Sequence, residues 1–462
     1  MLAGRGSRFG AAGALALALV AGGALAIGAS GDTALISRES ASAGGDGANG
    51  ASGAPSVSGD GRLTAFATEA DNLGGPRDPG VKNVYLYDAT TAKTELVSRR
   101  GKKGGGDGAD GDSTNPSISA DGRFVAFETE AANLGGPAVT GRRCQPESRP
   151  CSNIYVYDTQ RSRVRLVSRQ SKDDGGRGAN ADSINPAISA DGLSIAFETF
   201  AGNLGGPVQG QSNVYVYDRD RDRVALVSRQ SAADGGEGGE PGGAGTPSIS
   251  ADGRFVAFWT NDDNLGGPKT AFNAIYVYDR GQREVTLVSR QSAGDGGAGA
   301  VRSSYDPSIS ADGRFVAFFT YAGNLGGPVQ FPGNVCVYDL QQQTVELVSR
   351  QSDDAGGAGV DGLADSPSIS ADGSAVAFLT QATNLGGAIA ATRNVYVYDR
   401  ASRWVELASR QSSAAGGQGA DRDSRDPAIA GDGASVAFTT GADNLGGPAR
   451  DVANVYRHER DG

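Results

Sequence analysis

The chain has 462 residues and a net charge of −11 at neutral pH, and it contains 72 glycines but only one histidine, His458. An acidic chain without clustered lysine and arginine is poorly suited to contact phosphates, so nucleic acid is excluded as a partner. A single histidine also leaves little scope for imidazole-based metal binding or acid–base catalysis.

The first 30 residues are typical of an export signal. Arg5 and Arg8 precede an apolar stretch at residues 10–28, and small residues follow at the spacing that signal peptidase requires. The alternative is an uncleaved anchor, because the stretch is nearly long enough to span a bilayer. We interpret residues 1–30 as a signal peptide. We therefore expect export to the periplasm, the cell surface or the medium, with membrane contact only through an uncleaved signal.

Residues 31–462 are dominated by one repeat. A proline-led segment, in its commonest form Pro-Ser-Ile-Ser-Ala-Asp-Gly, recurs about every 60 residues with one interval of 70. The seven copies begin at Pro55, Pro116, Pro186, Pro247, Pro307, Pro367 and Pro427. Such regular spacing predicts a repeat architecture that forms one domain.

Each repeat carries four strand signals. The first two flank an Asp-Gly pair, as at Asp252 and Gly253, which is a strong signal for a hairpin turn. A third strand is predicted at residues 213–218 and a fourth at 345–350, with counterparts in the other repeats. The strands are apolar on both faces, as expected for sheets packed between two neighbours. The pattern predicts an all-β, seven-bladed propeller with four antiparallel strands per blade.

The register of the repeats also predicts how the ring closes. The last repeat ends with its third strand, at residues 454–456. Residues 33–38, Thr-Ala-Leu-Ile-Ser-Arg, have the fourth-strand pattern and precede the first repeat. We expect this N-terminal strand to pair with the last blade and cover its open edge.

The repeat core Pro-x-x-Ser-x-Asp-Gly-x-x-x-Ala-Phe, followed by Val-Tyr-Val-Tyr-Asp, resembles the TolB-like, WD-like β-propeller repeat of bacterial exported proteins. The resemblance covers residues 32–459 and implies a propeller. The chain differs from TolB in having seven repeats rather than six, and its repeats are longer. The envelope partners of TolB are therefore not transferred to it.

Candidate binding residues lie on one face of the predicted disc. The second-to-third and fourth-to-first connections are long and leave from the same face, the loop face, where function on a rigid scaffold is expected. Near the ends of the second strands, aromatic residues replace the polar residues of other repeats at Phe200, Trp259, Phe319 and Tyr321, with Phe272, Tyr305 and Phe331 in adjoining loops. We interpret them as a patch for a glycan or a protein, the alternative being rings that pack between blades.

Carboxylates occupy the same strand ends in the first three repeats, at Glu69, Glu128, Glu130 and Glu198. Glycosidases use two carboxylates, so a catalytic pair is one interpretation. The other interpretation is that these side chains are exposed to solvent and have no catalytic role.

A third chemistry is suggested by the fourth-to-first loops, which repeat Gly-Gly-x-Gly-x followed by Asp, Asn or Glu. The last position holds Asn49, Asp110, Asn180, Glu240, Asp361 and Asp421, and the fifth repeat departs with Val301. Oxygen ligands on glycine turns suit calcium. The alternative is a soluble, glycine-rich loop, so we expect no cofactor and keep calcium as a possibility.

Cysteine usage agrees with export. Cys144 and Cys151 lie in one insertion and are predicted to form a disulfide in an oxidising compartment. Cys336 occupies a strand position where other repeats have tyrosine, which predicts a buried free thiol.

No Gly-x-Ser-x-Gly motif is present and no histidine neighbours a plausible nucleophile, so the chain is not expected to be an enzyme. The expected function is a non-enzymatic, exported scaffold that binds a protein or glycan at the cell envelope. The alternatives are an enzyme that acts on envelope polysaccharide through loop-face carboxylates, and a calcium-stabilised structural module.

Overall fold

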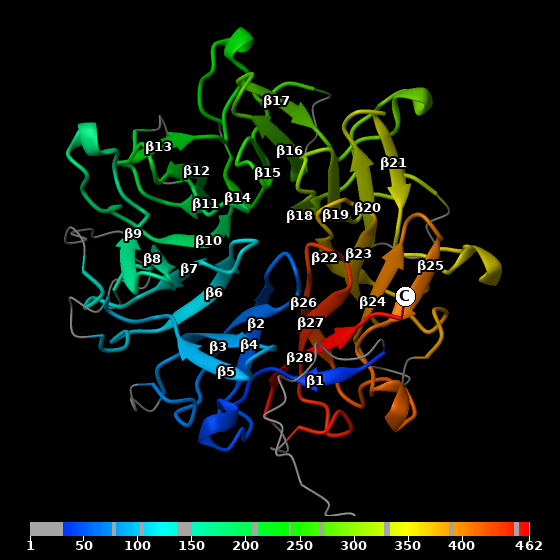
Figure 1. Ribbon diagram of the computed structural model, residues 1–462. Coiled ribbons are helices and arrows are strands. Elements are labelled where there is room, and N and C mark those ends of the chain that lie inside the picture. The colour runs from blue at the N-terminus through cyan, green and yellow to red at the C-terminus, as the bar shows by residue number, and fades with distance from the viewer. Residues whose placement is uncertain are drawn as a thin grey trace, which may run out of the picture.

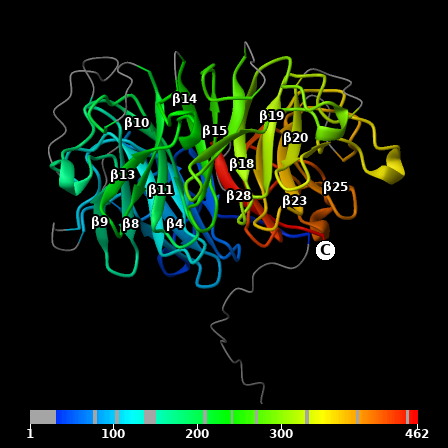
Figure 2. The ribbon, with the colours of Figure 1, turned by 90° about the horizontal axis from the view of Figure 1, so that it is seen from above.

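Seven four-stranded antiparallel sheets surround a central axis in the computed structural model (Figure 1). The structure describes residues 31–75, 80–101, 106–135, 150–205, 211–239, 242–267, 272–327, 333–387, 392–447 and 452–461. Seen from the side, the molecule is a disc whose blades stand next to one another (Figure 2). The predicted seven-bladed propeller is confirmed.

The strands follow the repeat, and blades are numbered in chain order. Blade 1 holds β2 (Ser52–Val57), β3 (Leu63–Thr68), β4 (Asn83–Asp88) and β5 (Lys93–Leu96). Blade 2 holds β6 (Ser113–Ile118), β7 (Phe124–Thr129), β8 (Asn153–Asp158) and β9 (Arg163–Leu166). Blade 3 holds β10 (Ser183–Ile188), β11 (Ser194–Thr199), β12 (Asn213–Asp218) and β13 (Arg223–Leu226).

The remaining blades repeat the pattern. Blade 4 holds β14 (Ala244–Ile249), β15 (Phe255–Thr260), β16 (Ala274–Asp279) and β17 (Glu284–Leu287). Blade 5 holds β18 (Ser304–Ile309), β19 (Phe315–Thr320), β20 (Asn334–Asp339) and β21 (Thr344–Leu347). Blade 6 holds β22 (Ala364–Ile369), β23 (Ala375–Thr380), β24 (Asn394–Asp399) and β25 (Trp404–Leu407). Blade 7 holds β26 (Ser424–Ile429), β27 (Ser435–Thr440), β28 (Asn454–Glu459) and the N-terminal β1 (Thr33–Leu35).

The core is divided among the blade interfaces. Among the described residues, seven hydrophobic clusters each draw on two neighbouring blades. A fully buried phenylalanine of the second strand recurs in every blade, as at Phe66 and Phe127, and it stacks on a third-strand tyrosine in most of them. Cys336 stands opposite Phe318 in place of that tyrosine and is a buried free thiol, as predicted. Each sheet therefore depends on both neighbours for its core.

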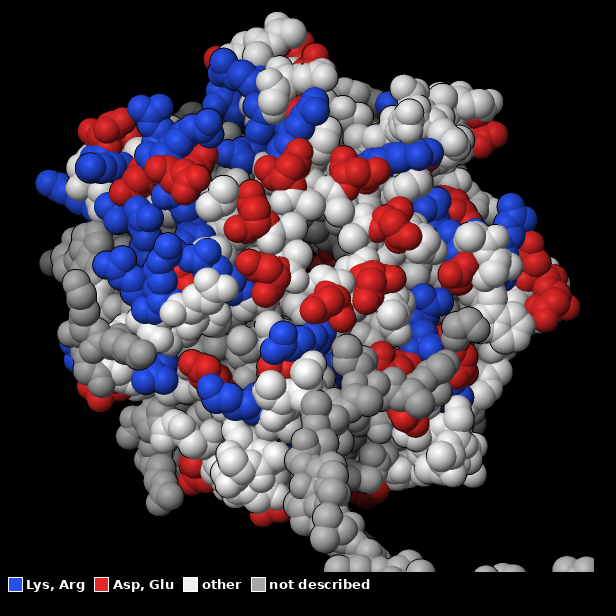
Figure 3. All heavy atoms as spheres, viewed as in Figure 1, with Lys and Arg blue, Asp and Glu red and all other residues white. Residues whose placement is uncertain are grey.

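The first strands contact one another around the axis and line the central channel. A ring of backbone hydrogen bonds joins their turns on the face opposite the loops: each blade donates an N–H to the carbonyl of the next, with N···O distances of 2.8–3.0 Å. The bonds run through Gly59, Ala120, Ala190, Ala251, Ala311, Ala371 and Gly431, and the N–H of Asp432 returns to Gly59. An Asp-Gly pair follows each linked residue, and acidic side chains surround the central opening on this hairpin face (Figure 3).

The fourth-to-first connections do not stay on the loop face as expected. They run along the outer strand of the next blade and form short 3-10 helices at the rim of the disc (Figure 1). These are η1 (Ala41–Ala43), η3 (Lys172–Asp174), η4 (Ala232–Asp234), η5 (Ala293–Asp295), η6 (Asp353–Ala355) and η7 (Ser413–Ala415). The serine before each helix accepts a backbone N–H of that outer strand, as Ser352 does from Val405 at 2.8 Å. The connections thereby cover strand edges that would otherwise be open.

The N-terminal strand closes the ring in the predicted register. Thr33, Ala34 and Leu35 pair with His458, Arg457 and Tyr456 of β28. The strand is shorter than expected, but Ile36 continues it with a backbone bond to Val455 at 2.8 Å. The connection that follows blade 6 contacts β1 in the same way as the other connections contact the outer strand of the next blade. The N–H of Thr33 donates to Ser412 Oγ at 2.8 Å.

Candidate binding site at the loop-face mouth of the channel

The site is built where the first strands begin, at the loop-face end of the channel. Every pairing of a first with a second strand shifts its register there by a β-bulge. The bulged residue adopts a left-handed conformation with φ between 45° and 53°, a strained arrangement that often marks functional backbone. Five residue types occupy this position in the seven blades: Ala54, Asn115, Asn185, Thr246, Asp306, Ser366 and Asp426.

Two of the predicted carboxylates meet in one hydrogen-bond network. Glu198 Oε2 accepts the Nδ2–H of Asn185 at 3.1 Å and the N–H of Thr246 at 3.2 Å. Glu128 Oε2 accepts the Nδ2–H of Asn115 at 3.1 Å, and the backbone of Asn185 also donates to Glu128. Asn185 therefore joins the two carboxyls of neighbouring blades. Burial raises the pKa of both, although these hydrogen bonds oppose the shift.

The other two predicted carboxylates lie apart from this network. Glu69 of blade 1 is largely exposed and forms an ion pair with Lys82 Nζ at 3.5 Å. Glu130 is partly buried at the end of β7.

An aromatic row continues the site across blades 4 and 5. The ring centroids of Trp259 and Tyr305 are 6.1 Å apart, those of Tyr305 and Phe319 6.4 Å, and those of Phe319 and Tyr321 4.7 Å. Phe319 is buried, whereas Tyr321 at the end of the row is 40% exposed and accessible to a ligand from solvent. Trp259 Nε1–H donates to Thr246 Oγ1 at 2.9 Å, which links the row to Glu198 through one threonine.

The structure thus brings Trp259, Phe319 and Tyr321 together with Tyr305, which lies on β18 and not in an adjoining loop as expected. Phe200 lies on blade 3 and is 38% exposed, and no ring contact of Phe200 is found among the described residues. Phe272 is also exposed, and Phe331 lies outside the described residues.

Two further carboxyls, those of Asp306 and Asp365, lie on blades 5 and 6. Burial raises the pKa of Asp306, and the nearby charge of Asp365 raises it further. Both carboxylate oxygens of Asp365 accept the Nη2–H groups of Arg393 at 2.6 Å. Sequence reasoning did not find Asn185, Thr246, Asp306 or this ion pair. A sequence signal for the first three was available, because each occupies the position immediately before the repeated proline and that position varies among the repeats.

At the positions proposed to bind calcium, side-chain oxygens accept backbone hydrogen bonds from the protein itself. Asp361 Oδ1 accepts the N–H groups of Thr383 and Asn384, and Asp110 Oδ1 accepts those of Ala132 and Asn133. Glu240 lies outside the described residues. In the part of the chain that the structure describes, no group of three or more histidine, cysteine, aspartate or glutamate side chains is placed to hold a metal.

Cys151 is disulfide-bonded. Its expected partner, Cys144, lies outside the described residues, so that pairing stays a prediction. No described helix is long and apolar enough to cross a membrane, and the expected signal segment, residues 1–30, also lies outside the described residues.

Comparison with known proteins gives fold neighbours only. No protein-family model and no curated protein matches the chain. TolB from Acinetobacter baumannii is a structural match at 16% identity and a TM-score of 0.41, covering 80% of this chain and 66% of that one. An oligogalacturonate lyase in complex with manganese matches at 12% identity and a TM-score of 0.52, covering 94% of this chain and 98% of the lyase.

A third match is an acylaminoacyl peptidase from Pyrococcus horikoshii, at 12% identity and a TM-score of 0.51. It covers 89% of this chain, which spans about half, 52%, of the peptidase. This chain likewise spans about two thirds of the TolB chain. Identities this low show only that the fold is shared. At the level of the fold, the predicted likeness to TolB-type propellers is confirmed.

These matches correct the expectation that the chain is not an enzyme. The lyase is matched over nearly its whole length, so proteins of this fold include enzymes. The absence of a serine-nucleophile motif and of a usable histidine therefore does not exclude activity. That expectation rested on the missing serine-nucleophile motif and the single histidine, although catalytic groups can come from several blades and then leave no local motif.

Proposed function

We propose that this protein is exported and binds a carbohydrate chain at the loop-face mouth of its channel, at the cell envelope or outside the cell. The observation that supports this most directly is the aromatic row of Trp259, Tyr305, Phe319 and Tyr321, which Thr246 connects to the carboxylate of Glu198. Sugar rings stack on aromatic faces, and carboxylates accept hydrogen bonds from sugar hydroxyls.

The charges around the row favour an uncharged or amino sugar. Glu128, Glu198, Asp306 and Asp365 all belong to the mouth, and the Arg393 guanidinium is already paired with Asp365. A uronic acid brought to this mouth meets like charges in a partly desolvated setting, where repulsion is strong. The ligand class therefore differs from the uronate named for the lyase with the same fold.

The binding proposal is tested with cell-wall glycan and with soluble cello-, chitosan and galacturonate oligosaccharides of equal length. Tyr321→Ala removes the open end of the row and is expected to weaken binding at least tenfold. Phe272→Ala is the matched control, because Phe272 is equally exposed but lies outside the row. Equal affinity of the two variants, or capture of a protein from envelope extract without any glycan, would contradict the proposal.

A second function is favoured by the network of Glu128, Asn185 and Glu198. Two carboxyls with raised pKa lie on neighbouring blades, Glu198 buried and Glu128 partly buried. They suit a reaction in which one gives a proton to a glycosidic oxygen while the other acts as base or nucleophile. In this case the bound glycan is also hydrolysed.

Hydrolysis is tested by measuring new reducing ends. Glu198→Gln and Glu128→Gln are expected to lower the rate by at least a hundredfold while the glycan still binds, with Glu69→Gln as the control on blade 1. Binding without any new reducing ends in the wild type would refute hydrolysis and leave the binding proposal in place.

A further inference from the structure

A recurring ion pair stabilises the hairpin face in four blades. The arginine just before the second strand donates from both Nε and Nη2 to the aspartate that ends the third strand, a geometry suited to guanidinium and carboxylate. The pairs are Arg62–Asp88, Arg123–Asp158, Arg254–Asp279 and Arg314–Asp339. In three of them the guanidinium also lies 4.6 Å from the centre of the phenylalanine ring that follows it.

Blade 6 has the aspartate but lacks the arginine. Ser374 occupies the arginine position, and blade 7 has Ala434 there. The side chain of Asp399 is 28% exposed, against 6–15% for the four paired aspartates. Its nearest guanidinium nitrogen, Arg460 Nη2, is 3.7 Å away, whereas the paired arginines approach to 2.6–3.0 Å.

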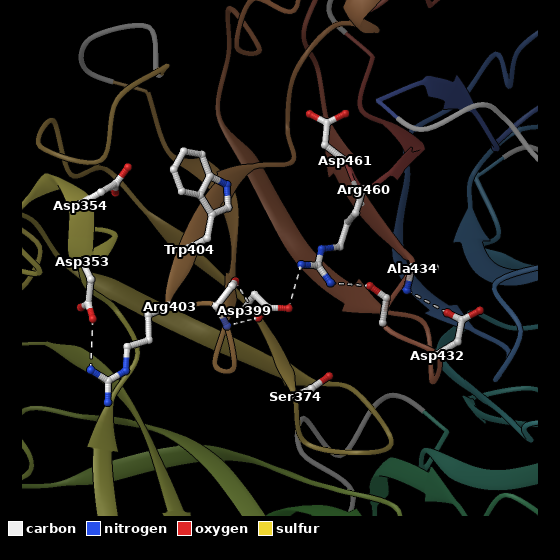
Figure 4. A pocket seen from close by; sticks show the side chains of 12 residues that line it. Asp353, Asp354, Ser374, Asp399, Arg403, Trp404, Asp432, Ala434, Arg460 and Asp461 are labelled. Atoms are coloured by element: carbon white, nitrogen blue, oxygen red, sulfur yellow. Dashed lines mark hydrogen bonds and ion pairs between the residues drawn. The ribbon is translucent and has the colours of Figure 1, made fainter.

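A cleft of about 850 Å³ opens at this point between blades 6 and 7 (Figure 4). Ser374 and Ala434 line it, so it lies where two arginine side chains are missing. Five aspartates and two arginines border the cleft, which is therefore acidic. The two arginines already have other partners. Arg403 pairs with Asp353, and Arg460 donates to the carbonyl of Gly433 at 2.8 Å and lies 3.5 Å from Glu406 Oε2.

An exposed tryptophan stands beside Asp399. Trp404 pairs directly with Asp399 across strands β24 and β25, so the two side chains emerge on the same side of the sheet. Trp404 is 53% exposed, and tryptophan is enriched among the residues that contribute most to binding a partner. The equivalent positions in blades 1 to 5 carry polar residues: Lys93, Arg163, Arg223, Glu284 and Thr344.

We propose that this cleft binds an arginine side chain of a partner peptide. The guanidinium takes the place that Arg62 and its counterparts fill in other blades, with two hydrogen bonds to Asp399. Trp404 supplies the aromatic face that phenylalanine supplies beside those arginines. Further aspartates of the cleft, such as Asp354 and Asp432, attract a second basic residue of the same peptide. This site lies on the hairpin face and is independent of the glycan proposal.

The test restores the missing arginine. Ser374→Arg places in blade 6 the side chain that four blades already carry, so it fills the site without an unfamiliar local structure. Leu193→Arg is the matched control, because blade 3 also lacks the arginine but its Asp218 is paired with Arg221 at 2.8 Å. Thermal melts of both variants verify that the propeller is folded.

Binding is followed by Trp404 fluorescence in a Trp259→Phe background, with an acetylated and amidated Gly-Arg-Gly-Arg-Gly peptide. We expect saturable binding that Ser374→Arg weakens at least tenfold and Leu193→Arg leaves unchanged. The peptide with citrulline in place of arginine should not bind. Equal binding in both variants, equal binding of the citrulline peptide, or a response only to neutral oligosaccharide would overturn the proposal.

Discussion

Burial disfavours the ionised carboxylate of Asp88, yet hydrogen bonds from Arg62, Thr91 and Thr90 outweigh that effect and lower its pKa to about 2. A carboxyl whose pKa is lower in the folded than in the unfolded chain stabilises the fold above the unfolded pKa. That contribution is lost as the pH falls through the folded pKa. The same pairing recurs in four blades, so single side chains on the hairpin face contribute to a shared acid sensitivity.

Arg62→Gln is therefore expected to lower the free energy of unfolding by about 1 kcal/mol at pH 7, allowing for solvent screening of this partly exposed pair. The difference from the wild type should disappear as the pH falls from about 4 to about 2. Urea denaturation across that pH range measures it. The exposed Arg302 provides the control substitution, Arg302→Gln, and an equal loss there would show that the ion pair is not responsible.

At the scale of the elements, the strands were predictable and the connections were not. Proline, Asp-Gly and alternating β-branched and aromatic residues place the strands in every repeat, and the offset of residues 33–38 predicts the closing strand. The path of the fourth-to-first connections depends on contacts with the next blade, such as Ser352 with Val405, which no local pattern reveals. Their glycine and acidic residues were therefore assigned to the loop face and to a calcium motif.

The candidate site was predictable to the same extent. Trp259, Phe319 and Tyr321 differ from the residues at equivalent positions in other repeats, and such differences mark a site within a symmetric fold. Asn185 and Thr246 escaped notice because their role arises from a bulge that turns them toward the neighbouring second strand. A bulge changes register without changing the hydrophobic pattern from which strands are predicted.

The closing strand gives a prediction at this scale. A chain that begins at Gly31 should melt like the full propeller, whereas one that begins at Glu39 loses β1 and Ile36 and should be less stable by on the order of 5 kcal/mol. Differential scanning calorimetry compares the two. A synthetic peptide of residues 31–38 should restore the melting temperature of the shorter chain. Identical melts of the two chains would show that β1 does not close the ring.

For the whole molecule, the two faces of the disc differ in chemistry. The loop face carries aromatic rings and partly desolvated carboxyls, which suit a ligand without negative charge. The hairpin face carries the ring of turn aspartates and the acidic cleft beside Trp404. With a net charge of −11, the chain also attracts cations at long range.

Ionic strength should separate the two faces. Raising the salt concentration from about 0.05 to about 0.5 M shortens the screening length severalfold and is expected to weaken binding of the arginine peptide about tenfold. The affinity for a neutral oligosaccharide should stay within about twofold, because stacking and short hydrogen bonds are little screened. Isothermal titration calorimetry measures both. Salt dependence of the same size for both ligands would contradict this division.

The most direct measurement for the glycan site is the fluorescence of Trp259, in a Trp404→Phe background, during titration with the cello- or chitosan oligosaccharide that binds best. We predict a saturable change with the affinity found by calorimetry, reduced at least tenfold by Tyr321→Ala. Binding by calorimetry without any response of Trp259, or tighter binding of the galacturonate oligosaccharide, would contradict the placement of the ligand on the aromatic row.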